Sequence, residues 1–218
     1  MGNPCHTIVL ATRNAGKTRE IVDLLNAFPV CIKNLGDFGL IPAIEEDGAT
    51  FDENAYKKAS LTARYLGIPA LADDSGLTVE ALGGAPGVYS ARYGGTEATD
   101  HERCQKLLRE LGDHDDRRAA FECVLSLAVP GGPALTYEGR CEGRIVDTPA
   151  GTNGFGYDPI FYYPPLNKTF AQLSMAEKSR VSHRGKALRE FCDEFEKVMI
   201  WLTQHMPKQA PGGCMGAG

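Results

Sequence analysis

Two long segments with the composition of β-strands flank a short turn in the middle of the chain. Residues 118–129 are mostly apolar, residues 135–145 alternate between apolar and polar, and Pro-Gly-Gly-Pro separates them at 130–133. Two strand-forming runs joined by a short glycine-containing turn predict an antiparallel hairpin. The chain is therefore expected to build a sheet around this long hairpin.

Alternating strand and helix patterns precede the hairpin, and helical patterns follow it. The chain opens with a β-branched apolar run at 7–11, a polar loop, and a helical pattern at 19–28 that ends before Pro29. Strand–helix units beside an antiparallel hairpin predict an α/β fold with a mixed sheet. The further predicted helices are 50–66, 100–111, 174–180 and 182–206, and the further predicted strands are 30–32, 70–72 with a continuation at 77–79, and 160–163.

Length and composition indicate an ordinary globular protein. The chain has 218 residues, of which 43% are hydrophobic and 23% charged, and its net charge is −5. These values fit one large domain or two small ones. A general nucleic-acid-binding protein would carry a strong basic excess, so no nucleic-acid partner is expected. We expect one domain over 1–206 and a flexible tail over the Gly/Pro-rich residues 207–218.

The sequence carries no pattern typical of a membrane span or a secretory signal. The N-terminal residues lack a basic segment followed by a long apolar run, and no run approaches the roughly 20 apolar residues that a span requires. The seven cysteines are scattered and include no C-x-x-C pair, which argues against a zinc site or a disulfide framework. We therefore expect a cytoplasmic protein with reduced thiols and no membrane partner.

The polar loop from Ala11 to Thr18, between the first strand and the first helix, is one candidate site. Gly16, Lys17 and Thr18 match the end of the P-loop pattern, but Ala11 stands where that pattern has its first glycine. Backbone N–H groups at a helix N-terminus bind anions, and a lysine adds charge. The loop predicts a phosphate or nucleotide site, with a plain solvated loop as the alternative.

Two acidic segments are candidate parts of a site, and the first of them could supply a ligand to a hard cation. Glu45, Glu46 and Asp47 are consecutive in a loop, and Asp73 and Asp74 follow the apolar run at 70–72. Adjacent residues of a strand point to opposite faces, so one aspartate can brace the structure while the other faces a cleft at the strand's end. One or two carboxylates suffice for Mg²⁺. Solvated surface acids and turn or cap aspartates are the alternatives.

A glycine-rich segment in the second half of the chain has the side chains of a base-binding loop. In Gly154-Phe155-Gly156-Tyr157-Asp158 the glycines allow close approach of the backbone to a ligand, and an aromatic ring can stack on a base. The Asp158 carboxylate can accept hydrogen bonds from base N–H groups. A glycine-rich turn with core aromatics is the alternative.

Lys178, His183 and Arg184 flank a helix start at Ser182. An arginine offers a planar set of donors for carbonyl or phosphate oxygens. A basic helix end in solvent and a structural histidine are the alternatives, but the other motifs favour a site here.

The segments ATRNAGK, ENAYKKA, ADDSGL, LGGAPGVYSARY, PAGTNGFGYDPIF and AEKSRVSHRGKAL occur in that order over about residues 7–200. In this the chain resembles the inosine/xanthosine triphosphate pyrophosphatase family of the HAM1-like type. The resemblance implies an elongated α/β fold with a long mixed sheet, two flanking lobes and a central substrate cleft, in a homodimer. It also implies Mg²⁺-dependent hydrolysis of ITP, dITP and XTP to the nucleoside monophosphate and pyrophosphate.

The resemblance further implies roles for individual residues. Asp74 would be the general base and a metal ligand, with Glu45 as the other metal-binding acid and Glu46 as its alternative. The first loop and Lys58 would bind the triphosphate, and the later motifs would bind the base and ribose. The substrate-binding positions would be Thr12, Arg13, Asn14, Ala15, Gly16, Lys17, Lys58, Ser75, Phe155, Gly156, Tyr157, Asp158, Lys178, His183 and Arg184.

Two other functions stay open at this point. Gly16-Lys17-Thr18 with an acid after the strand 70–72 is also consistent with a P-loop-type NTPase or kinase, although Ala11 argues against it. A nucleotide-binding regulator without turnover would use the same loops. The related pyrophosphatase family that acts on pyrimidine triphosphates shares a similar fold but lacks this ordered set of segments.

Overall fold

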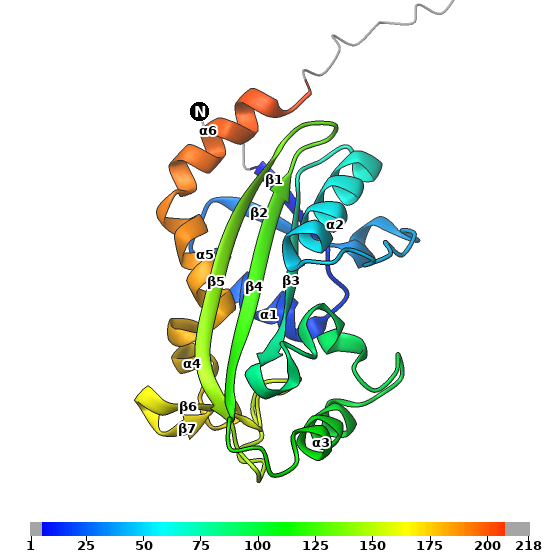
Figure 1. The fold of residues 1–218 in the computed structure, drawn as a ribbon. Helices are drawn as coiled ribbons and strands as arrows, with labels where there is room; N and C mark the ends of the chain where they lie inside the picture. The colour runs from blue at the N-terminus through cyan, green and yellow to red at the C-terminus, as the bar shows by residue number, and fades with distance from the viewer. Residues whose placement is uncertain (1–5, 208–218) are drawn as a thin grey trace, which may run out of the picture.

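A computed structural model describes residues 6–207 of the chain. Seven strands form one sheet in the order β2-β1-β3-β4-β5-β6-β7, in which β1 pairs in parallel with β2 and β3 and all other pairs are antiparallel (Figure 1). The strands are β1 (His6–Leu10), β2 (Val30–Asn34), β3 (Ala70–Val79), β4 (Arg118–Ala128), β5 (Ala134–Ile145), β6 (Phe161–Tyr163) and β7 (Lys168–Thr169). The predicted α/β fold with a mixed sheet is confirmed.

The predicted central hairpin is the longest feature of the sheet. β4 and β5 pair from Arg118↔Arg144 to Ala128↔Ala134, and β3 pairs along β4 on its other side. β4 is buried along almost its whole length, whereas burial along β5 alternates. The difference follows from the helices, because α2 packs against β4 far more than against β5, whereas α5 packs against both strands, and a strand covered on both faces forms a continuous apolar run.

Within residues 6–207, six α-helices surround the sheet. Figure 1 shows α2 beside the three long strands on one side and α5 and α6 along the other side of the molecule. The helices are α1 (Ala15–Leu25), α2 (Phe51–Leu66), α3 (Asp100–Leu111), α4 (Met175–Val181), α5 (His183–Asp193) and α6 (Phe195–His205). Short 3₁₀ turns lie at Leu35–Phe38, Glu80–Leu82, Gly87–Arg92, Pro164–Leu166 and Phe170–Gln172.

Capping residues set several of these boundaries as expected. The Thr50 side chain accepts a hydrogen bond from the Glu53 N–H at the start of α2, and Gly67 ends that helix with a φ of 72°. α3 begins after Thr99, which forms a reciprocal capping box with Glu102. Such caps satisfy helix-terminal N–H groups locally, so these boundaries follow from short-range sequence.

Other boundaries differ from the prediction. α1 begins at Ala15 rather than at residue 19, because the Asn14 side chain caps it. The predicted helix 182–206 is interrupted at Glu194, whose N–H is shared between the carbonyls of Glu190 and Cys192. β3 runs without a break through the acids at 73 and 74, so these residues lie mid-strand and not at a strand end. Pairing with β4 over the whole length of β3 supplies the backbone partners that make the strand continuous.

Among residues 6–207, no helix is long and apolar enough to cross a bilayer. The five cysteines in this range are all free thiols. The expected tail over 207–218 falls outside the described residues from 208 onward, and Cys5 and Cys214 fall outside them as well.

Candidate active site

A cavity of about 530 Å³ lies where the predicted motifs converge, and its volume is typical of a small-molecule site. Most of the residues predicted from the sequence line it, but Ala15, Gly16 and Glu45 do not. The predicted residues in its lining are Thr12, Arg13, Asn14, Lys17, Lys58, Asp74, Ser75, Phe155, Gly156, Tyr157, Asp158, Lys178, His183 and Arg184.

The first loop is held by its own side chains. The Asn14 carboxamide oxygen accepts hydrogen bonds from the N–H groups of Gly16 and Lys17 at 2.9 and 3.0 Å, and the Thr12 hydroxyl accepts from the Asn14 N–H at 3.2 Å. Two of the N–H groups at the start of the helix, those of Gly16 and Lys17, are thus already paired with Asn14. Arg13 donates to the Ile41 carbonyl oxygen at 2.7 Å, which ties this loop to the segment before α2.

β3 presents its two aspartates to opposite faces of the sheet, as period-two geometry requires. The Asp73 carboxylate pairs with Lys17 of α1 and Arg184 of α5, whereas the Asp74 carboxylate pairs with Lys58 of α2. Both side chains are buried. The prediction that one aspartate braces the structure while the other faces the cavity is consistent with this arrangement, because Asp74 lines the cavity and Asp73 does not.

Lys58 joins the acids on the α2 side of the cavity. Its Nζ lies 2.8 Å from Asp74 Oδ1, 2.8 Å from Glu46 Oε2 and 2.8 Å from the Asp73 carbonyl oxygen. The other oxygen of Asp74, Oδ2, is buried without a hydrogen-bond partner among the described residues. Burial raises the pKa of Asp74 to about 6, against the attraction of Lys58 and Lys17. A carboxyl group in this range exchanges a proton near neutral pH.

Glu46 rather than Glu45 lies beside Asp74. Glu46 lines the cavity and contacts Lys58, while Glu45 is exposed and lies outside the cavity lining. The sequence could not choose between these neighbours, because the backbone of residues 41–46 has no regular structure from which a side-chain direction follows.

The donor set fits one divalent cation. No group of three or more His, Cys, Asp or Glu side chains within residues 6–207 is placed to hold a metal. Mg²⁺ bound with a phosphate substrate needs only one or two carboxylates, since phosphate oxygens and water complete its six ligands. The neighbouring carboxylates of Asp74 and Glu46, which share Lys58, match that requirement.

Asp73 connects the two ends of the site. Its Oδ1 lies 2.5 Å from Lys17 Nζ and accepts from the Ser75 hydroxyl at 2.8 Å, and its Oδ2 lies 2.6 Å from Arg184 Nε and accepts from the Cys123 thiol at 3.2 Å. Burial alone would raise its pKa, but the Arg184 and Lys17 cations hold the pKa of Asp73 well below its usual range.

Glu20 is a site residue for which sequence reasoning assigned no role. Its carboxylate pairs with both Lys178, at 2.9 Å, and Arg184. Despite burial, these two cations lower the pKa of Glu20. Glu20 lies three residues after Lys17, on the buried side of α1 with Ile21. The sequence signal that could have identified Glu20 was the presence of an acid on the apolar side of this helix.

The glycine-rich segment 154–158 folds back on itself. The Asp158 carboxylate accepts from the Phe155 N–H at 2.9 Å and lies 2.5 Å from Lys178 Nζ. Gly154 has a φ of 76°, and a Cβ there would collide with the Asp158 carboxylate, so the turn requires glycine. The Phe155 ring lies over the cations of Lys178 and Arg184, with centroid distances of 4.7 and 5.6 Å.

The remaining polar groups of this end are fully buried. Arg184 uses Nε for Asp73, Nη1 for Glu20 and Nη2 for the Ser75 hydroxyl. His183 stacks on Phe121 at 4.7 Å between ring centroids, and its Nδ1 has no partner among the described residues. Burial, with Arg184 and Lys178 nearby, keeps the pKa of His183 well below its usual range. The imidazole is therefore neutral at pH 7 and presents one donor and one acceptor.

The model of the Ham1 family matches residues 8–194, which is most of the chain. This chain belongs to the Ham1 family. The family inferred from the ordered segments is thereby confirmed.

Individual relatives span almost the same region. The chain is 63% identical over 195 residues to the dITP/XTP pyrophosphatase of Syntrophobacter fumaroxidans, covering 89% of this chain and 84% of that protein. It is 58% identical over 204 residues to the dITP/XTP pyrophosphatase of Desulfotalea psychrophila, covering 94% and 92%. A HAM1 protein from Coxiella burnetii has a similar structure, with a TM-score of 0.79 and 46% identity over 91% of this chain and 99% of that one.

Within this Ham1 family member, the cavity also includes residues that sequence reasoning left out. Ser90 and Arg92 come from the turn before α3, and Asp100 and Arg103 from α3 itself. Arg92 donates to the Glu46 carbonyl oxygen at 2.8 Å, which helps to place the acid beside Lys58. Ser90 and Arg92 belong to the segment LGGAPGVYSARY that carries the family resemblance, although no role was assigned to them, whereas Asp100 and Arg103 lie outside every quoted segment.

Proposed function

We propose that this chain hydrolyses non-standard purine nucleoside triphosphates, namely ITP, dITP and XTP, to the nucleoside monophosphate and pyrophosphate. Water attacks the α-phosphorus, the bond from that phosphorus to the bridging oxygen breaks, and pyrophosphate leaves with that oxygen. The names of the relatives at 63% and 58% identity support this reaction. The single structural observation that carries it is the Asp74 carboxyl group in the cavity.

Asp74 is the proposed general base. Lys58 holds one carboxylate oxygen at 2.8 Å, which leaves Oδ2 free to accept a proton from the attacking water. Its raised pKa of about 6 suits that task at neutral pH. The fixed Oδ1 also orients the carboxylate, so little reorganisation is needed when the proton is transferred.

Lys17 and Lys58 are the proposed phosphate-binding cations. Both Nζ atoms contact β3, Lys17 at the Asp73 carboxylate and Lys58 at Asp74, so both lie near the proposed base. A triphosphate brings about four negative charges, and cations that face its oxygens stabilise the charge that develops during phosphoryl transfer.

Asp74 and Glu46 are the proposed ligands of Mg²⁺. A bound Mg²⁺ supplies additional positive charge to the phosphate oxygens and aligns them. Glu46 takes this role in place of Glu45 because it shares Lys58 with Asp74. Lys58 balances the negative charge that the two acids place together before the cation binds.

Lys178, His183 and Arg184 are proposed to read the purine. Hypoxanthine and xanthine carry a 6-keto acceptor where adenine carries an amino donor, so donors at this end favour the keto bases. A buried donor facing a donor costs roughly 1–3 kcal/mol. Arg184 retains two guanidinium N–H groups beyond the three paired with Asp73, Glu20 and Ser75.

The deciding experiment is release of pyrophosphate from ITP, XTP, GTP and ATP, each measured with Mg²⁺ and with a chelator. We expect metal-dependent release from ITP and XTP and little from ATP and GTP. Equal release from all four would retain the phosphate chemistry and refute the base-reading assignment. Orthophosphate release from ATP would instead indicate a P-loop-type NTPase, and tight ITP binding without turnover would indicate a regulator.

Two variants separate the proposed roles. Asp74→Asn should lose most turnover and keep ITP binding. Asp47→Asn is the matched control, because Asp47 is an exposed acid paired only with Lys57 among the described residues. Arg184→Ala should lower the preference for ITP over ATP. Retained turnover in the first variant, or an unchanged preference in the second, would refute the corresponding role.

We also propose that the chain acts as a homodimer in the cytoplasm, as the family resemblance implies. Sedimentation equilibrium of the purified chain, of mass 23.5 kDa, distinguishes a dimer from a monomer. A mass near that of one chain at micromolar concentration would refute the dimer.

A further inference from the structure

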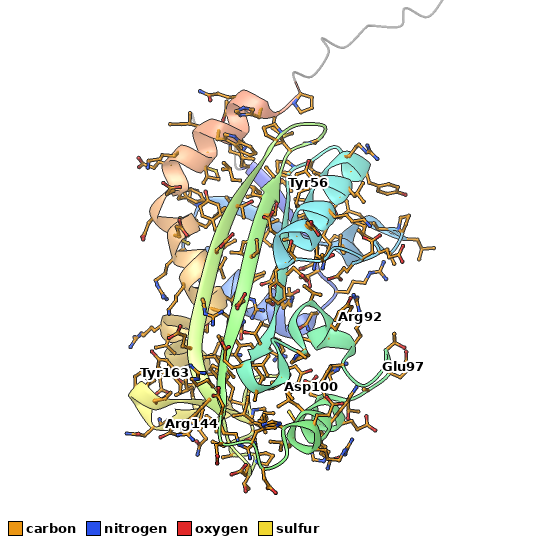
Figure 2. All side chains as sticks on the ribbon, viewed as in Figure 1. Tyr56, Arg92, Glu97, Asp100, Arg144 and Tyr163 are labelled. Atoms are coloured by element: carbon orange, nitrogen blue, oxygen red, sulfur yellow. The ribbon has the colours of Figure 1, made fainter. Side chains whose placement is uncertain are left out.

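Helix α3 contacts both backbone polar groups of Gly156 in the glycine-rich segment. The Asp100 carboxylate accepts a hydrogen bond from the Gly156 N–H at 2.6 Å, and the Cys104 thiol donates to the Gly156 carbonyl oxygen at 3.4 Å. Asp100 and Cys104 are four residues apart in α3, so they lie on the same face of the helix. Asp100 is labelled in Figure 2. Asp100 and Cys104 are separated from Gly156 by 56 and 52 residues in the sequence.

Gly156 is the point at which this segment changes direction. It has a φ of 63°, in the left-handed region, and lies between Phe155 and Tyr157. Tyr157 is buried and donates to the Ser90 carbonyl oxygen at 2.9 Å. Phe155 projects the other way, over the cations of Lys178 and Arg184. The orientation of the peptide group between Phe155 and Gly156, which carries the Gly156 N–H, therefore sets where the Phe155 ring lies.

The first turn of α3 faces the same space as that ring. Asp100 and Arg103 line the cavity together with Phe155 and Gly156. The Asp100 carboxylate also pairs with Arg103 at 2.6 Å. The guanidinium thus fixes the carboxylate oxygens so that one of them points at the Gly156 N–H.

We propose that Asp100 is a positioning residue for base selectivity. Through the Gly156 N–H, and together with the contact of Cys104 to the Gly156 carbonyl oxygen, it holds the Phe155 ring against the cations of Lys178 and Arg184. Hydrogen bonds to a charged acceptor are the stronger kind. Removal of this acceptor frees the segment to move while the sheet, Asp74 and the lysines near β3 stay in place. The selectivity part of this inference rests on the proposed function, whereas the ordering of the segment does not.

The first test follows hydrogen exchange in the ligand-free protein. In Asp100→Ala, we expect peptides that contain Gly156 to exchange about tenfold faster, because a lost hydrogen bond to a charged group changes a local opening constant by at least that factor. Asp100→Asn keeps one acceptor oxygen for the Gly156 N–H but loses the pairing with Arg103, so exchange in this variant should be slower than in Asp100→Ala. The same exchange rate in wild type and Asp100→Ala would overturn the proposal.

Glu102→Ala is the matched control. Glu102 is also an acid in the first turn of α3, and it completes the capping box with Thr99, but its recorded contacts do not include the glycine-rich segment. This variant loses helix stability without losing the Gly156 contact. Faster exchange at Gly156 in Glu102→Ala, equal to that in Asp100→Ala, would refute a specific role for Asp100.

The second test compares kcat/KM for ITP and ATP. We expect the ITP/ATP ratio to fall about tenfold in Asp100→Ala, which corresponds to about 1.4 kcal/mol, to fall less in Asp100→Asn, and to stay at the wild-type value in Glu102→Ala. A merely destabilised enzyme loses active molecules and lowers both rates equally, so the ratio would not change and the proposal would fail. If the wild type releases no pyrophosphate at all, the proposed function fails, and the exchange experiment alone decides the role of Asp100.

Discussion

Replacement of Glu20 by glutamine tests the buried charge balance on which the base end of the site depends. Three acids and three bases meet there: Glu20, Asp73 and Asp158 against Lys17, Lys178 and Arg184. Glu20 is 9% exposed and contacts two of the cations. Glu20→Gln keeps the shape and leaves one buried positive charge without compensation.

Loss of one partner from a buried ion pair costs roughly 3–5 kcal/mol. Gln keeps only one acceptor oxygen, and its NH₂ group faces the donors of the other cation, so we expect about 3–5 kcal/mol, which corresponds to a fall in Tm of about 6–20 °C in a protein of this length. The two cations lower the pKa of Glu20 in the folded state from 4.5. Its contribution is therefore complete above pH 4.5 and is lost as pH falls through the folded pKa.

The assay is thermal unfolding by circular dichroism of wild type, Glu20→Gln and Asp23→Asn between pH 4 and 8. Asp23 is an exposed acid on the same helix, so its variant controls for net charge and for the helix dipole. The Tm difference for Glu20→Gln should be constant from pH 8 to 6 and shrink below pH 4.5. A Tm within about 2 °C of the wild type at pH 7, or an equal loss in Asp23→Asn, would refute the charge-balance argument.

Two further predictions concern Asp74 and Gly16. The pKa of Asp74 rises from 3.8 to about 6 on folding, so the folded state holds this proton more tightly and stability is lost as pH rises between these values. Asp74→Asn should therefore be more stable than the ligand-free wild type at pH 8, by roughly 1–3 kcal/mol. Chemical denaturation at pH 4 and 8 that shows no pH-dependent difference between the two proteins would contradict this. A Cβ at Gly16 would lie 2.5 Å from the Phe155 ring, so Gly16→Ala should displace the ring. We expect the variant to raise KM for ITP severalfold more than it changes kcat. A normal KM in steady-state kinetics would show that the ring position does not matter for ITP binding.

Much of the architecture could be predicted because its signals are local. Thr50, Thr99 and Ser174 each cap a helix through a contact three residues away, and the Pro-Gly-Gly-Pro turn sets the β4–β5 hairpin. Lys17, at the start of α1, was found because a lysine at a helix N-terminus indicates an anion site, whereas Lys58 of α2 followed from the family resemblance. Glu46 was only an alternative to Glu45, since an irregular segment gives no rule for which side chain turns inward.

Local sequence signals specify the succession of strands and helices along the chain, the caps, the glycine turns and the family. How the charges are shared in the site depends on the tertiary fold. Glu20 meets Lys178 and Arg184 across 158 and 164 residues, and Asp100 meets Gly156 across 56. No local propensity encodes such pairs, because they exist only when β3, α1, α3 and α5 pack together. Burial then sets the protonation of Asp74 and His183, since the cost of charge in a dry site is a property of the assembled fold.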